Sequence, residues 1–196
     1  MTYKKERGMG MELKIPENFF VGAAMSGPQT EGAYKTGGRL ESIWDTWSDL
    51  SISDFYNKVG SYVGNNFYEK YEDDIKLLKS LHMDSFRTSM QWSRLLTKDG
   101  KLNQEGAQFY HKVCKCAKEN QIELFMNLYH FDMPTYLFER GGWESRDVVE
   151  AYAAYARAAF REFGSEIRYW FTFNEPIVEP DQRYRNGFWY PFIKDA

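Results

Sequence analysis

The sequence predicts a parallel α/β fold, and the (β/α)₈ TIM barrel is favoured with about its first four β/α units present. Apolar strand-like runs alternate with amphipathic helical segments. This alternation is typical of parallel sheets buried on both faces. Polar side chains follow each run, as they do at the carboxyl ends of barrel strands. An open doubly wound sheet is the alternative, but no GxGxxG fingerprint follows the first run, which disfavours its nucleotide-binding version.

Four segments are predicted to be strands, the second of them with polar residues near its end, and the first ends at the breaker Ser26-Gly27-Pro28. The segment between the first two strands, residues 27–64, is rich in Gly, Ser and Asp and predicts a long loop with short helical turns. Such a loop in a compact domain is usually functional. The predicted strands cover residues 19–25, 83–90, 122–129 and 169–173.

Three segments have helical periodicity. Apolar residues recur at steps of four and three from Phe67 to Leu81, which predicts one amphipathic helix. Asn103 is expected to cap a second helix. Ser145 is expected to cap a third, which Gly164 ends. Residues 1–16 are polar and are expected to be a loose N-terminal segment, with residues 17–196 as the half-barrel.

Composition bounds the class of protein. A chain of 196 residues with 43% hydrophobic and 27% charged residues suits one globular domain. The formal net charge of −3 gives no electrostatic footprint for nucleic acid. The aromatic share of 18% weakly favours a carbohydrate ligand over the plain alternative of core and surface aromatics.

Location is predicted from what the sequence lacks. Cys114 and Cys116 lie two apart in a predicted helix, so they do not face each other, and a reduced compartment fits better than a disulfide. The N-terminus lacks an apolar signal region, and no run approaches the ~20 apolar residues of a membrane span. We therefore expect a cytoplasmic protein that binds neither membrane nor nucleic acid.

The segment Thr172-Phe173-Asn174-Glu175-Pro176 is the most informative stretch. It brings a carboxylate to a strand end, where aromatic neighbours could raise its pKa for acid/base work. Pro176 predicts an extended backbone at Glu175, and Asn174 suits a sugar hydroxyl. The alternative is a solvated loop glutamate beside a turn proline.

Other strand ends carry further candidates. Gln29 and Glu31 follow the first run, and Arg87 offers a fixed cation that could orient a carboxylate or form a structural ion pair. His130 could be a hydroxyl ligand, a base or a core histidine. The three histidines fall at separate predicted positions, so no metal site is expected.

Several segments together resemble glycoside hydrolase family 1. The joint occurrence of QxEG, RxSxxWSR, HxDxP and TFNEP is specific, and the match runs over residues 17–196 in the family's order. The segments SGPQTEG, WESRDVV and GFWYPFIKDA are most similar to the 6-phospho-β-glucosidase branch. The chain departs from many members at Phe131, where a tryptophan is common, and at residues 64–69, where an Asp and a His are common.

The resemblance implies a retaining β-glycosidase without cofactor, acting on a small-molecule sugar such as a phospho-β-glucoside. It implies that Glu175 is the acid/base, Asn174 binds the hydroxyl next to the reacting carbon, and Gln29 and His130 hold other hydroxyls. Arg87 would lie beside the nucleophile. In such chemistry the acid/base first protonates the leaving oxygen and later deprotonates water.

The family's second carboxylate has no counterpart in these residues. A (β/α)₈ barrel takes roughly 250 residues, so we expect a half-barrel fragment that is inactive alone and self-associates through exposed strand edges. Asp132 and Glu31 could share the cleft, although the resemblance gives neither the nucleophile role. The alternatives are a plain β-glucosidase or 6-phospho-β-galactosidase, and a non-catalytic half-barrel piece.

Overall fold

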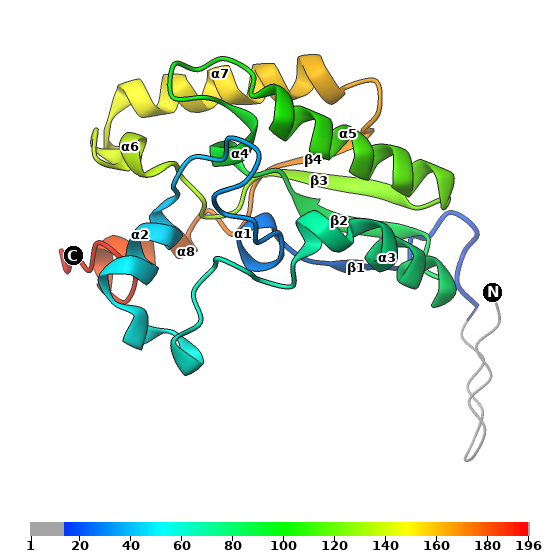
Figure 1. Cartoon of the computed structure of the whole chain (residues 1–196), viewed down its shortest axis with the longest axis horizontal. Coiled ribbons are helices and arrows are strands. Elements are labelled where there is room, and N and C mark those ends of the chain that lie inside the picture. The colour runs from blue at the N-terminus through cyan, green and yellow to red at the C-terminus, as the bar shows by residue number, and fades with distance from the viewer. Residues whose placement is uncertain (1–13, 196) are drawn as a thin grey trace.

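The computed structural model describes residues 14–195, which form a four-stranded sheet with helices packed on one face (Figure 1). All pairings are parallel and the strands lie in chain order. This is the arrangement of consecutive barrel units, so the predicted partial (β/α)₈ barrel is confirmed. The strands are β1 (Gly22–Ala24), β2 (Ser85–Ser89), β3 (Glu123–Tyr129) and β4 (Tyr169–Phe173). Of the predicted loose segment 1–16, only residues 14–16 are described.

The first strand is shorter than predicted. The apolar run begins at Phe19, but only Gly22–Ala24 pairs with β2, and Phe19, Phe20 and Val21 are exposed large hydrophobics before it. β1 has β2 as its one neighbouring strand in the sheet that the described residues form, so it ends where its pairing with β2 ends. The apolar composition of residues 19–21 does not by itself make them part of the strand. Phe20 instead contacts the rings of Phe125 and Tyr169 across the sheet.

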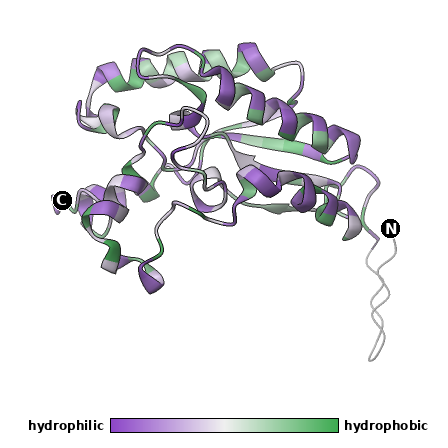
Figure 2. Cartoon of the chain, viewed as in Figure 1, coloured by the Kyte–Doolittle hydropathy of each residue, from purple (hydrophilic) through white to green (hydrophobic). Residues whose placement is uncertain are grey.

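The long helices are close to their predicted ranges. Asn103 takes the predicted N-cap position, but its side chain does not cap, because Nδ2 donates to the carbonyls of Gly37 and Arg94 at 2.6 and 2.9 Å. Figure 2 shows hydrophilic and hydrophobic residues on different sides of these helices, as expected for amphipathic segments. They are α3 (Phe67–Ser80), α5 (Gln104–Glu119) and α7 (Arg146–Phe163).

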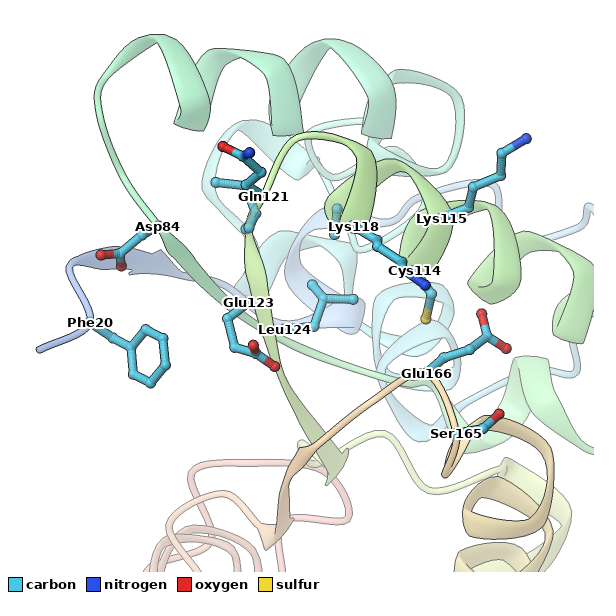
Figure 3. A pocket seen from close by; sticks show the side chains of 12 residues that line it. Phe20, Asp84, Cys114, Lys115, Lys118, Gln121, Glu123, Leu124, Ser165 and Glu166 are labelled. Atoms are coloured by element: carbon cyan, nitrogen blue, oxygen red, sulfur yellow. The ribbon is translucent and has the colours of Figure 1, made fainter. Parts of the chain in front are cut away.

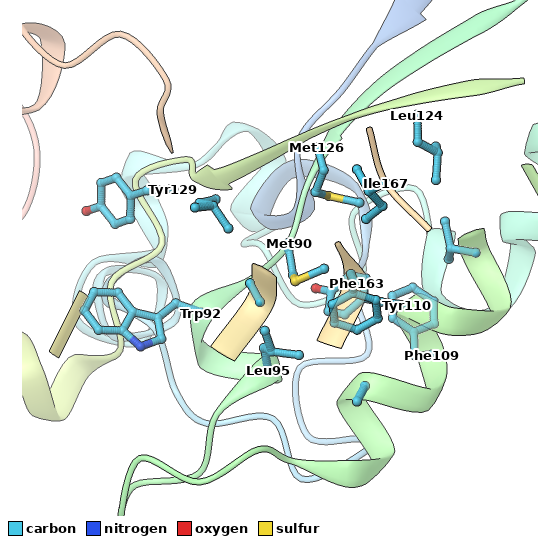
Figure 4. Packing of buried hydrophobic residues seen from close by; sticks show 14 of the residues in the cluster. Met90, Trp92, Leu95, Phe109, Tyr110, Leu124, Met126, Tyr129, Phe163 and Ile167 are labelled. Atoms are coloured by element: carbon cyan, nitrogen blue, oxygen red, sulfur yellow. The ribbon is translucent and has the colours of Figure 1, made fainter. Parts of the chain in front are cut away.

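The main core lies between the sheet and these helices. Leu124, Met126 and Leu128 alternate along β3 and are at most 5% exposed. Figure 4 shows Leu124 and Met126 near side chains from the helices, among them Tyr110 and Phe163. Both cysteines are buried, free thiols on α5. One face of the sheet is thus closed by apolar packing.

The opposite face of the sheet is open. Arg87, Phe125 and Tyr169 are register partners on this face. Phe125 stacks on Tyr169 at 4.6 Å, and Phe171 is 45% exposed. In a closed barrel this face would be interior. The described residues therefore leave an aromatic inner surface uncovered.

The short helices all lie in connections that follow the carboxyl ends of the strands. The predicted loop 27–64 contains α1 and α2, and α2 and α8 lie at the same end of the molecule (Figure 1). The active sites of barrel enzymes are built at this end. The elements are α1 (Gly27–Thr30), α2 (Ile43–Leu50), η1 (Ile52–Asp54), η2 (Tyr56–Lys58), α4 (Trp92–Leu95), α6 (Thr135–Phe138), η3 (Gly142–Glu144), α8 (Val178–Pro180) and η4 (Asp181–Arg185).

Candidate active site

One cavity of about 600 Å³ lies at the carboxyl ends of the strands. The five residues to which the family resemblance assigns a role all line it, each from the end of a different strand or its connection except for the adjacent pair Asn174 and Glu175. Aromatic side chains complete the wall. The five are Gln29, Arg87, His130, Asn174 and Glu175, and the aromatic residues are Trp44, Phe55, Phe131 and Trp189.

A cavity of about 700 Å³ lies at the other end of the strands (Figure 3). Residues just before β2, β3 and β4 line it, among them Asp84, Gln121 and Glu166. Burial raises the pKa of the Cys114 thiol there to about 12, so this thiol is a poor nucleophile. Because barrel chemistry sits at the carboxyl ends, we assign the candidate site to the 600 Å³ cavity.

Arg87 and Asn174 are joined directly. Arg87 Nη2 donates to Asn174 Oδ1 at 2.8 Å, and the guanidinium lies 5.6 Å from the centre of the Phe171 ring. Asn174 also donates its backbone N–H to Tyr129 O at 2.9 Å, which continues the pairing of β4 with β3. The amide oxygen of Asn174 is therefore engaged, and its two N–H groups are left to face a ligand.

Glu175 lies in a turn and not in extended backbone. Its φ is +40°, and its carbonyl accepts a hydrogen bond from Val178 N at 2.9 Å. The prediction of an extended residue was wrong because the proline rule disfavours only the right-handed helical region. Positive φ at a residue with a side chain is uncommon and clusters at functional sites. The side chain is exposed at the cavity.

The aromatic surroundings of Glu175 also differ from the prediction. Trp170 packs on Phe160 of α7, and neither Trp170 nor Phe171 lines the cavity. The aromatic wall comes from Trp44 and Trp189, whose ring centres are 5.2 Å apart. Sequence reasoning missed both residues. The signal available was a tryptophan in the Gly- and Ser-rich loop after the first strand.

His130 is a neutral, mostly buried ring. It is 8% exposed, and burial together with the Arg87 charge lowers its pKa to about 4. Asn127 Nδ2 lies 3.4 Å from His130 Nδ1. Asp132 Oδ1 accepts the backbone N–H of His130 at 3.0 Å. A neutral imidazole in this position can both donate and accept a hydrogen bond.

Gln29 is held at the cavity by the turn after β1. Ser26 Oγ donates to Gln29 Oε1 at 2.6 Å. Gly27 N donates to Ser89 Oγ at 2.7 Å, which ties α1 to the end of β2. A Cβ on Gly27 would lie 2.6 Å from Gln91 Cγ, so glycine permits this close approach. The amide nitrogen of Gln29 remains for a ligand.

Glu31 and Asp132 do not line the cavity, so the expectation that they could share it was wrong. Glu31 is 1% exposed and accepts hydrogen bonds of 2.7 Å from Arg94 Nε, Gln91 Nε2 and Tyr110 Oη. Asp132 is fully buried and accepts the backbone N–H groups of His130 and Trp92. Burial raises the Asp132 pKa to about 7. Both carboxylates serve to connect loops.

Within residues 14–195, no group of three or more His, Cys, Asp or Glu side chains could hold a metal ion. Over the same residues no helix is long and apolar enough to cross a membrane.

A parallel sheet in chain order, with polar side chains gathered at its carboxyl end, defines half of a barrel-enzyme scaffold. The profile of glycosyl hydrolase family 1 matches residues 11–196, and the chain belongs to this family.

Similar proteins cover the chain almost completely. The 6-phospho-beta-glucosidase GmuD of Bacillus subtilis is 42% identical over 92% of the chain, and beta-glucosidase A of Acetivibrio thermocellus is 36% identical over 94%. The solved family 1 β-glucosidase of Thermotoga maritima covers 93% of the chain at 32% identity and a TM-score of 0.87. The chain spans 39%, 41% and 41% of these three proteins.

Proposed function

We propose that this chain is the acid/base half of a retaining β-glycosidase that hydrolyses 6-phospho-β-glucosides. The observation that carries the proposal is the convergence of Gln29, Arg87, His130, Asn174 and Glu175 on one cavity. Retaining hydrolysis needs two carboxyl groups about 5–5.5 Å apart. In the part of the chain that the structure describes, Glu175 is the one carboxylate that lines the cavity. The nucleophile would come from the rest of the barrel.

The neighbours of Glu175 suit binding of a sugar. The free amide N–H groups of Asn174 and Gln29 are donors for hydroxyl oxygens, and neutral His130 adds a third polar contact. Trp44 and Trp189 supply apolar surface for the faces of a sugar or its aglycone. Arg87 offers a cation that would orient the nucleophilic carboxylate contributed by the rest of the barrel. Glu175, at the cavity edge, would protonate the leaving oxygen and later activate water.

The phosphate preference rests on the 42% identity to a protein named as a 6-phospho-beta-glucosidase. Several relatives named as β-glucosidases are 36–41% identical, so an unphosphorylated β-glucoside is the second candidate, and 6-phospho-β-galactosides remain a third. Among described residues, Arg87 is the one lysine or arginine that lines the cavity, and it is bound to Asn174. Cations for the phosphate would therefore come from the missing part of the barrel.

A non-catalytic, self-associating half-barrel is the other candidate. It is supported by the exposed inner ring of Phe171 and by the outer edges of β1 and β4, which no other described strand covers. The cytoplasmic location and the division of the chain at residues 16 and 17 stay predictions.

Sugar binding by the chain itself tests the proposal. Adding methyl β-D-glucoside to ¹⁵N-labelled protein is expected to shift the side-chain NMR signals of Gln29, His130 and Asn174, and Glu175→Gln is expected to keep this binding. Hydrolysis of a chromogenic β-glucoside or its 6-phosphate by the chain alone is not expected. Turnover that Glu175→Gln leaves unchanged would contradict the assignment of Glu175 as the acid/base. The absence of any shift at the highest sugar concentration tested would contradict sugar binding at this cavity.

A further inference from the structure

Asn127 is a fully buried amide on β3, three residues before His130. Its Nδ2 donates to Tyr129 O at 2.9 Å and lies 3.4 Å from His130 Nδ1. Its Oδ1 is buried and has no hydrogen-bond partner within residues 14–195. A buried amide with one unpaired oxygen costs stability, so its orientation needs a physical reason.

The carbonyl of Tyr129 supplies that reason. Tyr129 O already accepts the backbone N–H of Asn174 at 2.9 Å. Exchanging the oxygen and nitrogen of the Asn127 amide would place Oδ1 about where Nδ2 now lies, against another oxygen with no proton between them. Two facing acceptors repel, so the hydrogen-bond network fixes the amide with its nitrogen toward Tyr129. The same nitrogen then faces His130 Nδ1.

A neutral imidazole has one N–H and one bare nitrogen. Because Asn127 presents a donor, His130 Nδ1 must be the bare nitrogen. His130 Nε2 then carries the proton. No described residue forms a hydrogen bond with this nitrogen, and it does not belong to the buried side-chain atoms that lack a partner. We propose that Asn127 is a positioning residue that fixes His130 as the Nε2–H tautomer, making His130 a hydrogen-bond donor to a ligand oxygen in the cavity.

The charged surroundings of His130 are compatible with a neutral ring. Arg87 from β2 shares the cavity and disfavours a second positive charge. Asp132 turns its carboxylate to backbone N–H groups of His130 and Trp92, and Glu175 lines the same cavity. The role of this donor in binding a sugar rests on the proposed function, whereas the tautomer itself does not.

The tautomer can be read directly from the ¹⁵N chemical shifts of the His130 ring, assigned by loss of its signals in His130→Gln. The unmodified chain at pH 7 is expected to show a bare Nδ1 and a protonated Nε2. A protonated Nδ1, or an even mixture of tautomers, would overturn the proposal. This measurement needs no ligand and no activity.

Two variants test whether Asn127 sets the tautomer. Asn127→Leu removes the donor and is expected to give a mixture of tautomers. Asn127→Asp places an acceptor opposite Nδ1 and is expected to move the proton there and to raise the His130 pKa by about one unit or more. Asn120→Asp, at the end of α5, is the matched control and is expected to leave His130 unchanged. Identical ring spectra in every variant would overturn the proposal.

Binding of methyl β-D-glucoside separates this proposal from the proposed function. Asn127→Asp is expected to weaken binding about tenfold, which is ~1.4 kcal/mol, while Asn120→Asp keeps it. If the predicted tautomer is found and no sugar binds, the proposed function fails and the role of Asn127 stands. If sugar binds equally well after the tautomer has changed, His130 is not the donor we propose.

Discussion

Glu31 Oε2 lies 2.7 Å from Arg94 Nε, and both side chains are shielded from solvent. This ion pair joins the segment after β1 to α4, which follows β2. Glu31→Gln keeps the shape but leaves the Arg94 charge buried without its partner. Loss of one partner of a buried pair costs about 3–5 kcal/mol, and urea unfolding is expected to show a loss of this size.

Glu72→Gln is the matched control for that substitution. Its pair with Lys76 on α3 is 3.5 Å long and more than half exposed on both sides. Exposed pairs contribute about 0–1 kcal/mol, so the free energy of unfolding is expected to change little. Equal losses for the two variants would show that the buried pair does not hold the loops together.

Arg87→Lys tests the orientation of Asn174. Lysine keeps a positive charge but lacks the fixed guanidinium geometry, so the bond to Asn174 Oδ1 is expected to be lost. The side-chain amide signal of Asn174 should shift, and the affinity for methyl β-D-glucoside should fall about tenfold, since hydrogen bonds to charged groups contribute ~1.5–3 kcal/mol. Arg157→Lys on the exposed side of α7 is the control. If the affinity of Arg87→Lys for methyl β-D-glucoside is unchanged, Arg87 does not contribute to sugar binding through Asn174.

Asp132 predicts a dependence of stability on pH. Its pKa is raised from 3.8 to about 7 by burial, so its contribution is fully present below pH 3.8 and is lost as pH rises through 7. His130 has the opposite sign, because its pKa falls from 6.5 to about 4 and its contribution is lost as pH falls through 4. The two effects oppose each other between these values.

Asp132→Asn removes the titrating carboxyl group, so comparison with this variant measures the contribution of Asp132 to the pH dependence of stability. From pH 5 to pH 8 the free energy of unfolding of the unmodified chain is expected to fall relative to that of Asp132→Asn by a few kcal/mol. Urea titrations at several pH values measure this difference. A difference that does not vary with pH would mean that Asp132 is ionised throughout this range.

Phe171 predicts the self-association of the half-barrel. It is 45% exposed on the open inner face, on β4, an edge strand of the sheet that the described residues form. Phe171→Ser is expected to reduce the sedimentation coefficient toward that of the monomer, because the apolar surface available for contact is smaller. Tyr56→Ser, at the first residue of η2, which is 88% exposed and far from the inner face of the sheet in sequence, should leave association unchanged. A well-folded monomer before any substitution would contradict the prediction.

The sequence alone was sufficient for β3 and β4, because each is a largely apolar run closed by polar residues, and for β2, whose polar residues lie between Met83 and Met90. It failed at Phe19 and Phe20, where an apolar run continues outside the pairing of an edge strand. The positive φ of Glu175 depends on the turn toward α8, which a local proline rule does not describe. Trp44 and Trp189 meet only through tertiary packing, so no spacing along the chain predicts their contact.

The central claim is that Glu175 is the acid/base of a retaining glycosidase. Joining this chain to the complementary C-terminal residues of the Bacillus subtilis relative would complete the barrel, and folding can be checked by circular dichroism. We predict hydrolysis of a β-glucoside 6-phosphate with a poor leaving group, and a loss of roughly 10²–10⁴-fold on Glu175→Gln. For a substrate with a dinitrophenyl leaving group, which needs no proton to depart, Glu175→Gln should slow the bond-breaking step less. A folded chimera in which Glu175→Gln hydrolyses the poor substrate at the unmodified rate would contradict the claim.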